Sequence, residues 1–253
     1  MNKISVTVIT KNEENNISDC LKSVAWADEI IIVDSESTDR TVELAKQFTD
    51  KIFIRKWEGY VPQKRYALSL AANEWVLSLD ADERITPELK EEIINLSPGD
   101  YSGFKIRRKN FLLKKEITSC GWEKDYQLRL FKKDNADLND RLVHEKFIVD
   151  GKVGTLTNPM LHFTFSSFEE YLSKINSYTS LKAQELFKKK KRVGGWTIFS
   201  HTISAFFAFF IIRRGFKDGV YGLIISMLHA VSTMMNYVKL WELQNKNKSE
   251  TSA

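Results

Sequence analysis

The regular alternation of strand-length and helix-length segments near the N-terminus constrains this fold more than any other feature. Short apolar or β-branched runs have the length of buried strands, and they occupy residues 4–10, 29–34, 51–55 and 75–80. Helix-length segments lie between them, at residues 13–24, 38–48 and 60–72. This alternation predicts an α/β fold in which right-handed crossovers join parallel strands and helices flank the sheet.

The pattern changes after residue 100. Thr86 and Pro87 match an N-cap followed by a proline at the first helical position, so we expect a helix over residues 87–96. Alternating strand patterns then appear at residues 104–109, 126–132 and 146–153. They predict an antiparallel half that completes a mixed sheet. We therefore expect one domain over residues 1–165, in which residues 1–100 bind one ligand and residues 101–165 bind another.

The remaining residues, 166–253, are predicted to be helical. A helix at 168–191 ends in the basic run KKKKR, and an uncharged, phenylalanine-rich segment at 196–212 is at the short limit for a membrane span. A second apolar helix is expected at 219–240. Together they are typical of a helical hairpin at a membrane interface, with basic groups facing lipid phosphates. An oligomerisation surface and ordinary core packing are the alternatives.

Composition limits the class of protein. With 253 residues, 43% of them hydrophobic, the chain can bury a sizeable core. Cys20 and Cys120 lie far apart, which predicts neither a disulfide framework nor a zinc site. The net charge of +5 is concentrated at 188–192 and at Arg213 and Arg214, which favours anionic partners. The basic run lacks interleaved aromatic residues, so we do not expect nucleic-acid binding. The strand-like N-terminus has no signal-peptide pattern, and we expect a cytoplasmic location.

Acidic residues follow two of the predicted strands. Asp80 and Asp82 flank Ala81 at the end of the strand at 75–80, and Asp34 ends the strand at 29–34. Ligands bind outside the carboxyl ends of strands in open α/β sheets. Two acids at this position suit a divalent cation that holds a diphosphate, whereas the alternative is a turn with solvated acids. Asp34 is suited to a ribose hydroxyl pair or a base N–H.

Polar residues also follow the first strand. Thr10, Asn12 and Glu13 precede a predicted helix, where free N–H groups favour an anion, although a capping pattern looks the same. The glycine-rich dinucleotide motif and the P-loop motif are both absent from the sequence. NAD, FAD and P-loop nucleotide sites are therefore not expected.

Four motifs in order carry a resemblance to a known family. They are TKNEE at 10–14, VDSESTD at 33–39, Gln63-Lys64-Arg65, and LDADE at 79–83. Their order and spacing resemble the family 2 glycosyltransferases, which have the Rossmann-like GT-A fold. The resemblance implies that Asp34 contacts the nucleoside of a nucleotide-diphosphate sugar. It further implies that Asp80 and Asp82 bind ribose and a Mg²⁺ or Mn²⁺ ion, and that Thr10, Asn12, Glu13, Lys64 and Ala81 belong to the donor site.

Motifs further along resemble a subgroup of that family, the lipopolysaccharide inner-core β-glucosyltransferases. They are GWEKDYQLRLF at 121–131, RLVHE at 141–145 and LHF at 161–163. The resemblance implies inverting transfer of a hexose, such as glucose, to a cell-envelope glycan or lipid-linked acceptor at the cytoplasmic face of the inner membrane. Trp122, Arg129 and His144 are the expected acceptor residues.

Inversion requires a base that takes the proton of the acceptor hydroxyl. Glu145 is favoured as this base because of its distance downstream of the acid pair. At this position the chain has His-Glu, whereas many members of the family have Glu-Asp. Asp125 is the alternative base. His162 is either a further metal ligand or a packed core histidine. Lys64 either neutralises the diphosphate or lies on a solvated helix face, and Trp122 either stacks on a sugar or fills the core.

The sequence leaves alternatives to this function open. Among glycosyltransferases, the alternative is an enzyme whose acceptor is a capsule or exopolysaccharide glycan, or a protein. A nucleotidyltransferase shares such acids, but the glycine-rich N-terminal loop of those enzymes is missing. A non-catalytic membrane scaffold that keeps the fold is the alternative from another class.

Overall fold

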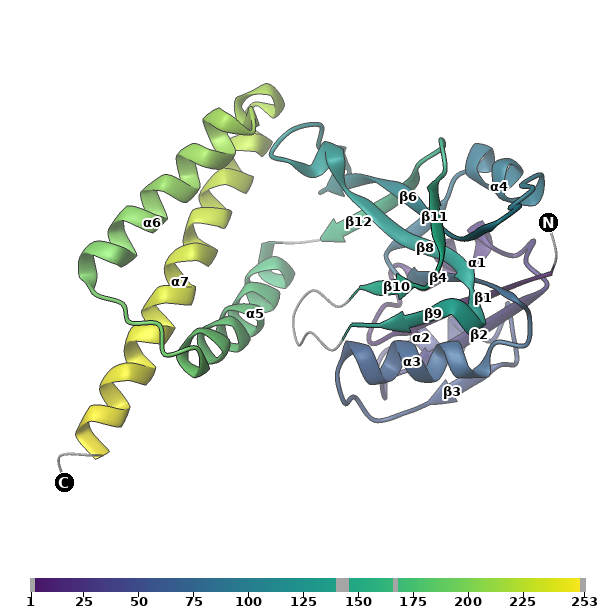
Figure 1. Ribbon diagram of the computed structural model, residues 1–253, viewed down its shortest axis with the longest axis horizontal. Helices are drawn as coiled ribbons and strands as arrows, with labels where there is room; N and C mark the ends of the chain where they lie inside the picture. Colours follow the sequence, from purple (N-terminus) through teal and green to yellow (C-terminus); the bar gives the residue numbers. More distant parts are fainter. Residues whose placement is uncertain (1–2, 140–145, 166–167, 251–253) are drawn as a thin grey trace. The chain divides into compact units, whose positions relative to one another are not determined.

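The computed structural model describes residues 3–139, 146–165 and 168–250 (Figure 1). The chain divides into two compact units. The first comprises the described residues up to 109 together with 124–163, and the second comprises 110–123 together with the described residues from 164 onward. The predicted boundary at residue 165 and the division into donor and acceptor halves remain predictions.

Parallel strands form the N-terminal part of the first unit, as the alternating pattern predicted. They are β1 (Ile4–Thr10), β2 (Glu29–Asp34), β3 (Ile52–Ile54) and β4 (Trp75–Asp80). The order β3-β2-β1-β4 places β1 between β2 and β4, with all three pairings parallel. The carboxyl ends of β1, β2 and β4 therefore meet at one edge of the sheet.

Antiparallel strands continue the same sheet beyond β4. Its order continues β4-β8-β6-β12-β5, and the strands are β5 (Glu83–Ile85), β6 (Tyr101–Leu112), β8 (Tyr126–Lys132) and β12 (Met160–Phe165). The mixed α/β sheet expected from the sequence is confirmed.

The prediction of one strand over residues 146–153 is wrong. This segment contains β10 (Phe147–Val149), which pairs with β9 (Ala136–Leu138) in a separate small sheet, and the start of β11 (Lys152–Thr155), which pairs with β6. Gly151 separates β10 from β11 with a φ of 114°, a conformation that glycine adopts without strain.

Four helices of the first unit were predicted, and the structure shortens each of them. They are α1 (Ile17–Ser23), α2 (Thr41–Ala45), α3 (Tyr60–Leu70) and α4 (Pro87–Ile94). The Thr86 side chain accepts a hydrogen bond from the Leu89 N–H, which confirms the predicted N-cap of α4. The start of α1 is delayed because residues 12–16 form a loop, in which Asn12 has a φ of 53°.

The main core lies between β1, β4 and the helices that cover them. Val6, Val8 and Leu77 are fully buried and pack with Ile17 and Leu21 of α1. These near-continuous apolar strands are expected where both faces of a sheet are covered. The buried strands hold the polar residues at their carboxyl ends in fixed positions.

The second unit is mostly helical. It contains β7 (Lys115–Glu116), which pairs with the end of β6, and the helices α5 (Phe168–Lys188), α6 (Gly195–Phe207) and α7 (Val220–Glu250). A π-helical turn at Ala208–Ile212 follows α6, and short 3₁₀ turns occur at Trp122–Lys124, Gly215–Asp218 and, in the first unit, Lys133–Asn135.

Helices α6 and α7 form the expected hairpin and lie side by side (Figure 1). Within the described residues, two stretches are long and apolar enough to cross a membrane, Gly195–Ile212 and Val220–Lys246. Gly222 of α7 lies against the backbone of Gly215, where a Cβ atom would collide with the Gly215 carbonyl group. This close approach requires a glycine where α7 passes the turn that precedes it.

Candidate functional site

Three predicted site residues lie together at the carboxyl edge of the parallel strands. Thr10 is paired with Asp34 in the β1–β2 register, and Ile9 is paired with Asp80 in the β1–β4 register. The strand order therefore places the ends of β2, β1 and β4 next to one another, as expected for a ligand site in an α/β sheet.

The loops that follow β1 and β2 are joined by hydrogen bonds. The Asn12 N–H donates to Ser37 Oγ at 2.8 Å, and the Thr38 N–H donates to Asn12 Oδ1 at 2.8 Å. The Glu13 N–H donates to Thr41 Oγ1 at 2.7 Å. Asparagine tolerates the left-handed conformation that this double contact requires of Asn12. In this arrangement the backbone and side chain of Asn12 hold the two loops together.

Asp34 is fully buried at the bottom of this edge. Its Oδ1 accepts a hydrogen bond from the Ser37 N–H at 2.8 Å, and its Oδ2 accepts one from Ser37 Oγ. Gln63 of α3 donates from Nε2 to Ser35 Oγ at 2.8 Å. Thr10 Oγ1 and Gln63 Oε1 are buried and have no hydrogen-bond partner among the described residues. The site around Asp34 thus contains polar oxygens whose hydrogen-bonding capacity the described residues do not fill.

Asp80 lies between two cations. Lys64 Nζ is 3.0 Å from Asp80 Oδ1, and Arg129 donates to Asp80 Oδ2 at 2.5 Å. Lys64 and Arg129 are both buried, so Lys64 does not lie on a solvated helix face. Burial disfavours the ionised form of Asp80, but Arg129 and Lys64 outweigh it and hold the pKa of this carboxyl well below its usual range.

Glu83 and Arg108 extend the charged cluster, and sequence reasoning missed both. The side chain of Glu83 is fully buried and forms ion pairs with Arg129 at 2.6 Å and with Arg108 at 3.3 Å. Its Oε2 also accepts a hydrogen bond from the Asp80 N–H at 3.0 Å. An acid that directly follows the acid pair in LDADE was the available signal for Glu83. No local pattern marked Arg108 on β6.

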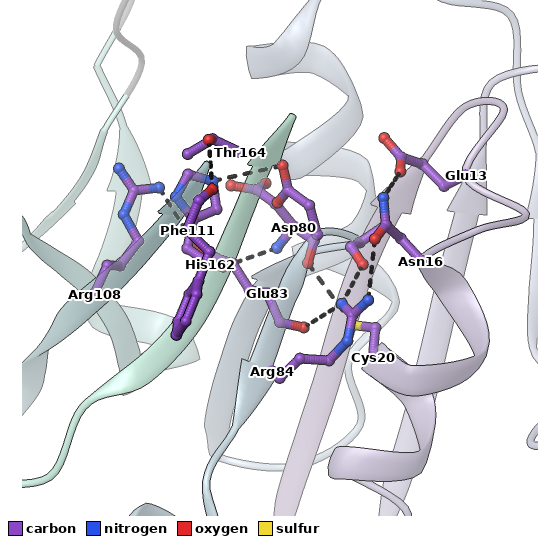
Figure 2. A network of polar contacts seen from close by, with 12 residues as sticks. Glu13, Asn16, Cys20, Asp80, Glu83, Arg84, Arg108, Phe111, His162 and Thr164 are labelled. Atoms are coloured by element: carbon purple, nitrogen blue, oxygen red, sulfur yellow. Dashed lines mark hydrogen bonds and ion pairs between the residues drawn. The ribbon is translucent and has the colours of Figure 1, made fainter. Parts of the chain in front are cut away.

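A second set of contacts connects the turn after β4 to the loop after β1. Arg84 donates to the Ala81 carbonyl oxygen at 2.8 Å and to Asn16 Oδ1 at 3.1 Å, and Asn16 donates to Glu13 Oε2 at 2.8 Å (Figure 2). Glu13 is therefore held by contacts within the chain. Ala81, which separates the two aspartates in the sequence, is buried.

Asp82 and His162 are brought together by strand pairing. His162 on β12 is paired with Glu83 on β5, the residue next to Asp82. His162 Nε2 lies 3.5 Å from Asp82 Oδ2, and the Phe163 N–H donates to the Asp82 carbonyl oxygen at 2.9 Å. The structure therefore places His162 beside the acid pair, although the two are far apart in sequence.

The donor set fits a cation that is shared with a substrate. Within the residues that the structure describes, no group of three or more His, Cys, Asp or Glu side chains is placed to hold a metal ion. A carboxylate oxygen and an imidazole nitrogen, as in Asp82 and His162, are ligands that Mn²⁺ accepts. Ions of this class commonly take their remaining ligands from phosphates and water. Asp80 is less suited to be a ligand of this ion, because Lys64 and Arg129 already contact its two carboxylate oxygens.

The other predicted residues lie in different places. Glu145 and His144 fall outside the described residues. Asp125 is ion-paired with Arg108 at 2.6 Å and accepts a hydrogen bond from Gln127. Arg129 pairs with Asp80 and Glu83 rather than standing free for an acceptor. Trp122 is half-buried and belongs to the second unit, whereas the acid cluster belongs to the first.

Comparison with known proteins gives consistent matches. The family model for "Glycosyl transferase family 2" matches residues 5–140, which is more than half of the chain. A protein of Rickettsia felis named "Uncharacterized glycosyltransferase" is 34% identical over 263 residues, covering 98% of this chain and 93% of its own. The lipopolysaccharide core biosynthesis glycosyltransferase LpsC of Rhizobium meliloti is 30% identical over 250 residues, covering 94% of this chain and 92% of its own.

A solved structure also aligns along most of the chain. The crystal structure of S. aureus TarS 1-349 in complex with UDP-GlcNAc covers 97% of this chain and 92% of that chain. The sequence identity is 17% and the TM-score is 0.49.

Proposed function

The chain belongs to glycosyltransferase family 2 and is a glycosyltransferase of the GT-A fold, and on that premise we propose that it moves a hexose from a nucleotide-diphosphate sugar to a cell-envelope glycan. The donor we propose is UDP-glucose, and the acceptor is the inner core of lipopolysaccharide. LpsC, the relative named for lipopolysaccharide core biosynthesis, supports this acceptor.

One observation supports the donor site above all. Asp34 ends β2, and Asp80 and Asp82 lie at the end of β4, at one edge of the sheet where β1 alone separates the two strands. Lys64 and Arg129 pair with Asp80. In the proposed complex, Asp34, Gln63 and Thr10 contact the nucleoside through buried oxygens. Lys64 contributes positive charge near the diphosphate. Asn12 and Glu13 hold the loops that border the sugar nucleotide.

Asp82 and His162 would hold a Mg²⁺ or Mn²⁺ ion. When bound, such an ion supplies positive charge that stabilises the leaving diphosphate. Asp80 then acts mainly through its contacts with Lys64 and Arg129, which fix the position of the acid pair. Ala81 keeps the turn between the two aspartates compact.

Glu145 is the base that we propose for removing the acceptor proton. Asp125, the alternative, is ion-paired with Arg108 through Oδ2 at 2.6 Å and accepts a hydrogen bond from Gln127 at Oδ1, so both of its oxygens are engaged within the chain. His144 and Trp122 remain the proposed contacts to the acceptor. Inversion follows if the acceptor oxygen attacks directly, since this scheme assigns no nucleophile to the protein.

We propose that the second unit binds the cytoplasmic face of the inner membrane through α6 and α7. Apolar side chains remain exposed along α6 and the turn after it, notably Trp196 (78%), Phe199 (58%) and Ile212 (78%). Large exposed apolar patches mark membrane or protein contacts. Arg213, Arg214 and the basic run at 188–192 flank these helices and suit anionic lipid.

Ligand-induced thermal stabilisation tests the donor assignment. A ligand that binds only the folded state raises the unfolding temperature. We expect UDP-glucose with Mn²⁺ to stabilise the full chain more than UDP-glucose alone. We expect Asp82→Ala to lose the metal-dependent part, whereas Asp50→Ala, which changes an exposed acid before β3, should retain it. Equal stabilisation with and without Mn²⁺ would contradict the proposed metal site, and no stabilisation by any nucleotide sugar would favour a non-catalytic scaffold.

A further inference from the structure

A cavity of about 500 Å³ lies within the first unit, beside the acid cluster. Residues from β8, β9 and β10 line it, together with Lys105 of β6, Lys64 of α3 and Val153 of β11. Every lining residue belongs to the first unit. The cavity is large enough for one or two sugar rings with a substituent.

The charge of the lining is one-sided. Lys64, Lys105, Arg129 and Lys146 all line the cavity, and among the described residues no aspartate or glutamate does. Lys64 and Arg129 are paired with Asp80. Lys105 and Lys146 are exposed and make no ion pair with the described residues. The described lining therefore carries positive charge that no described acid compensates, and such charge attracts an anionic ligand.

The cavity lies toward the antiparallel half of the sheet rather than toward Asp34. In the order β2-β1-β4-β8-β6, β8 and β6 lie on the opposite side of β4 from β2. Because β8 is antiparallel to β4, its first residues, beginning with Tyr126, lie at the level of the carboxyl end of β4. A ligand in this cavity would thus approach Asp80 from the side opposite to the nucleoside site proposed above.

Part of the cavity wall is apolar and exposed. Tyr126 is 45% exposed, Ile148 is 52% exposed and Val153 is 37% exposed. An aromatic ring and aliphatic side chains beside free lysines suit a sugar ring that bears a charged group. They do not suit a bare inorganic ion, which would contact only the lysines.

We infer that this cavity is an acceptor subsite for a phosphorylated sugar, with Lys105 and Lys146 binding the phosphate group. The inference rests on the proposed function, because it assigns the nucleotide sugar to the Asp34 side of β4. It adds a substrate class to that function: the acceptor carries a phosphate near the hydroxyl that is glycosylated.

Calorimetric titration of the full chain with glucose 6-phosphate, glucose and inorganic phosphate tests the inference, with and without saturating UDP and Mn²⁺. We expect glucose 6-phosphate to bind in both conditions, more tightly than either glucose or inorganic phosphate. Lys105→Ala and Lys146→Ala should each weaken it by roughly tenfold, the value of one charge-assisted hydrogen bond. Lys105→Arg should retain binding, and Lys22→Ala, which removes an exposed lysine of α1, is the matched control.

Four results of these titrations would overturn the inference. Displacement of glucose 6-phosphate by UDP would show that the cavity is part of the donor diphosphate site. The proposed phosphate contact would be contradicted by equal binding of glucose and glucose 6-phosphate, or by no binding of glucose 6-phosphate. Unchanged binding of glucose 6-phosphate in Lys105→Ala and Lys146→Ala would contradict it as well. Failure of UDP to bind would contradict the proposed function instead, and the titrations without UDP would still test the cavity.

Discussion

Replacing Arg129 with methionine should destabilise the first unit strongly. Arg129 is buried and bridges Asp80 at 2.5 Å and Glu83 at 2.6 Å, while Glu83 has no solvent exposure. Methionine replaces the aliphatic part of the arginine side chain and lacks the charged guanidinium group. The substitution therefore leaves two carboxylates close together without the cation between them, and Glu83 keeps Arg108 at 3.3 Å.

Breaking a buried ion pair from one side typically costs about 3–5 kcal/mol of unfolding free energy. With an m-value of about 2 kcal/mol/M in urea, this corresponds to a fall of roughly 1.5–2.5 M in the unfolding midpoint. In the double variant Arg129→Met with Glu83→Gln, the loss should be smaller than the sum of the two single losses, because the pair interacts directly.

The destabilisation should depend on pH in a defined direction. Arg129 and Lys64 hold the pKa of Asp80 below its usual value, against the effect of burial. A depressed carboxyl pKa contributes stability that is present above the unfolded pKa of about 3.9 and is lost as pH falls through the folded pKa. The difference between wild type and Arg129→Met should therefore be constant above about pH 5 and should narrow below about pH 4.

Urea unfolding of the full chain, followed by tryptophan fluorescence at several pH values, measures both effects. Arg40→Met is the control, since Arg40 makes an ion pair with Glu43 in which both side chains are mostly exposed, and such pairs contribute little. An unchanged midpoint for Arg129→Met at neutral pH, or a difference that grows as pH falls, would refute the reasoning.

Three further predictions concern the base, the core and the membrane. Glu145→Gln should bind nucleotide sugar normally with little turnover, measured by equilibrium binding and sugar transfer, and normal turnover would move the role to Asp125. Leu77→Ala removes a fully buried core side chain and should cost about 2–5 kcal/mol in urea unfolding, whereas a loss below 1 kcal/mol would show that the core is misplaced. Trp196→Glu combined with Phe199→Glu should reduce co-sedimentation with anionic vesicles, and unchanged vesicle binding would leave α6 as an oligomer or packing surface.

The parallel half of the fold was predictable because its signal is local. Each of β1, β2 and β4 is a short run of mostly apolar or β-branched residues that ends on a polar residue, and such runs are recognisable without knowing the partner strand. The positions of Asp34 and Asp80 at strand ends were predictable for the same reason, and their roles stay predictions.

Long-range features were less predictable. The alternating run at 146–153 has the pattern of one strand, and only the partners of β10 and β11 show that Gly151 divides it. Arg108 became part of the charged cluster through the pairing of β6 with β8, which no local pattern encodes. The proximity of His162 to Asp82 likewise depends on the pairing of β12 with β5.

The structure was also needed to tell whether a basic side chain contacts the substrate or forms an ion pair with a buried acid. The sequence placed Lys64 at the third helix and Arg129 in an expected acceptor motif, where both could face a ligand. Their contacts with Asp80 depend on three elements, α3, β4 and β8, that meet only in the folded chain. Burial of both cations indicates that fixing the acid pair is a large part of their role.

The central claim is transfer of a sugar from a nucleotide donor to an envelope glycolipid, and it is tested most directly by measuring UDP release from UDP-glucose by the purified full chain. With Mn²⁺ and truncated lipopolysaccharide inner core present, we predict UDP release with matching incorporation of glucose into the glycolipid, and loss of both in Asp82→Ala. No release above the background of Asp82→Ala, from UDP-glucose or any other nucleotide sugar with this glycolipid, would contradict the claim.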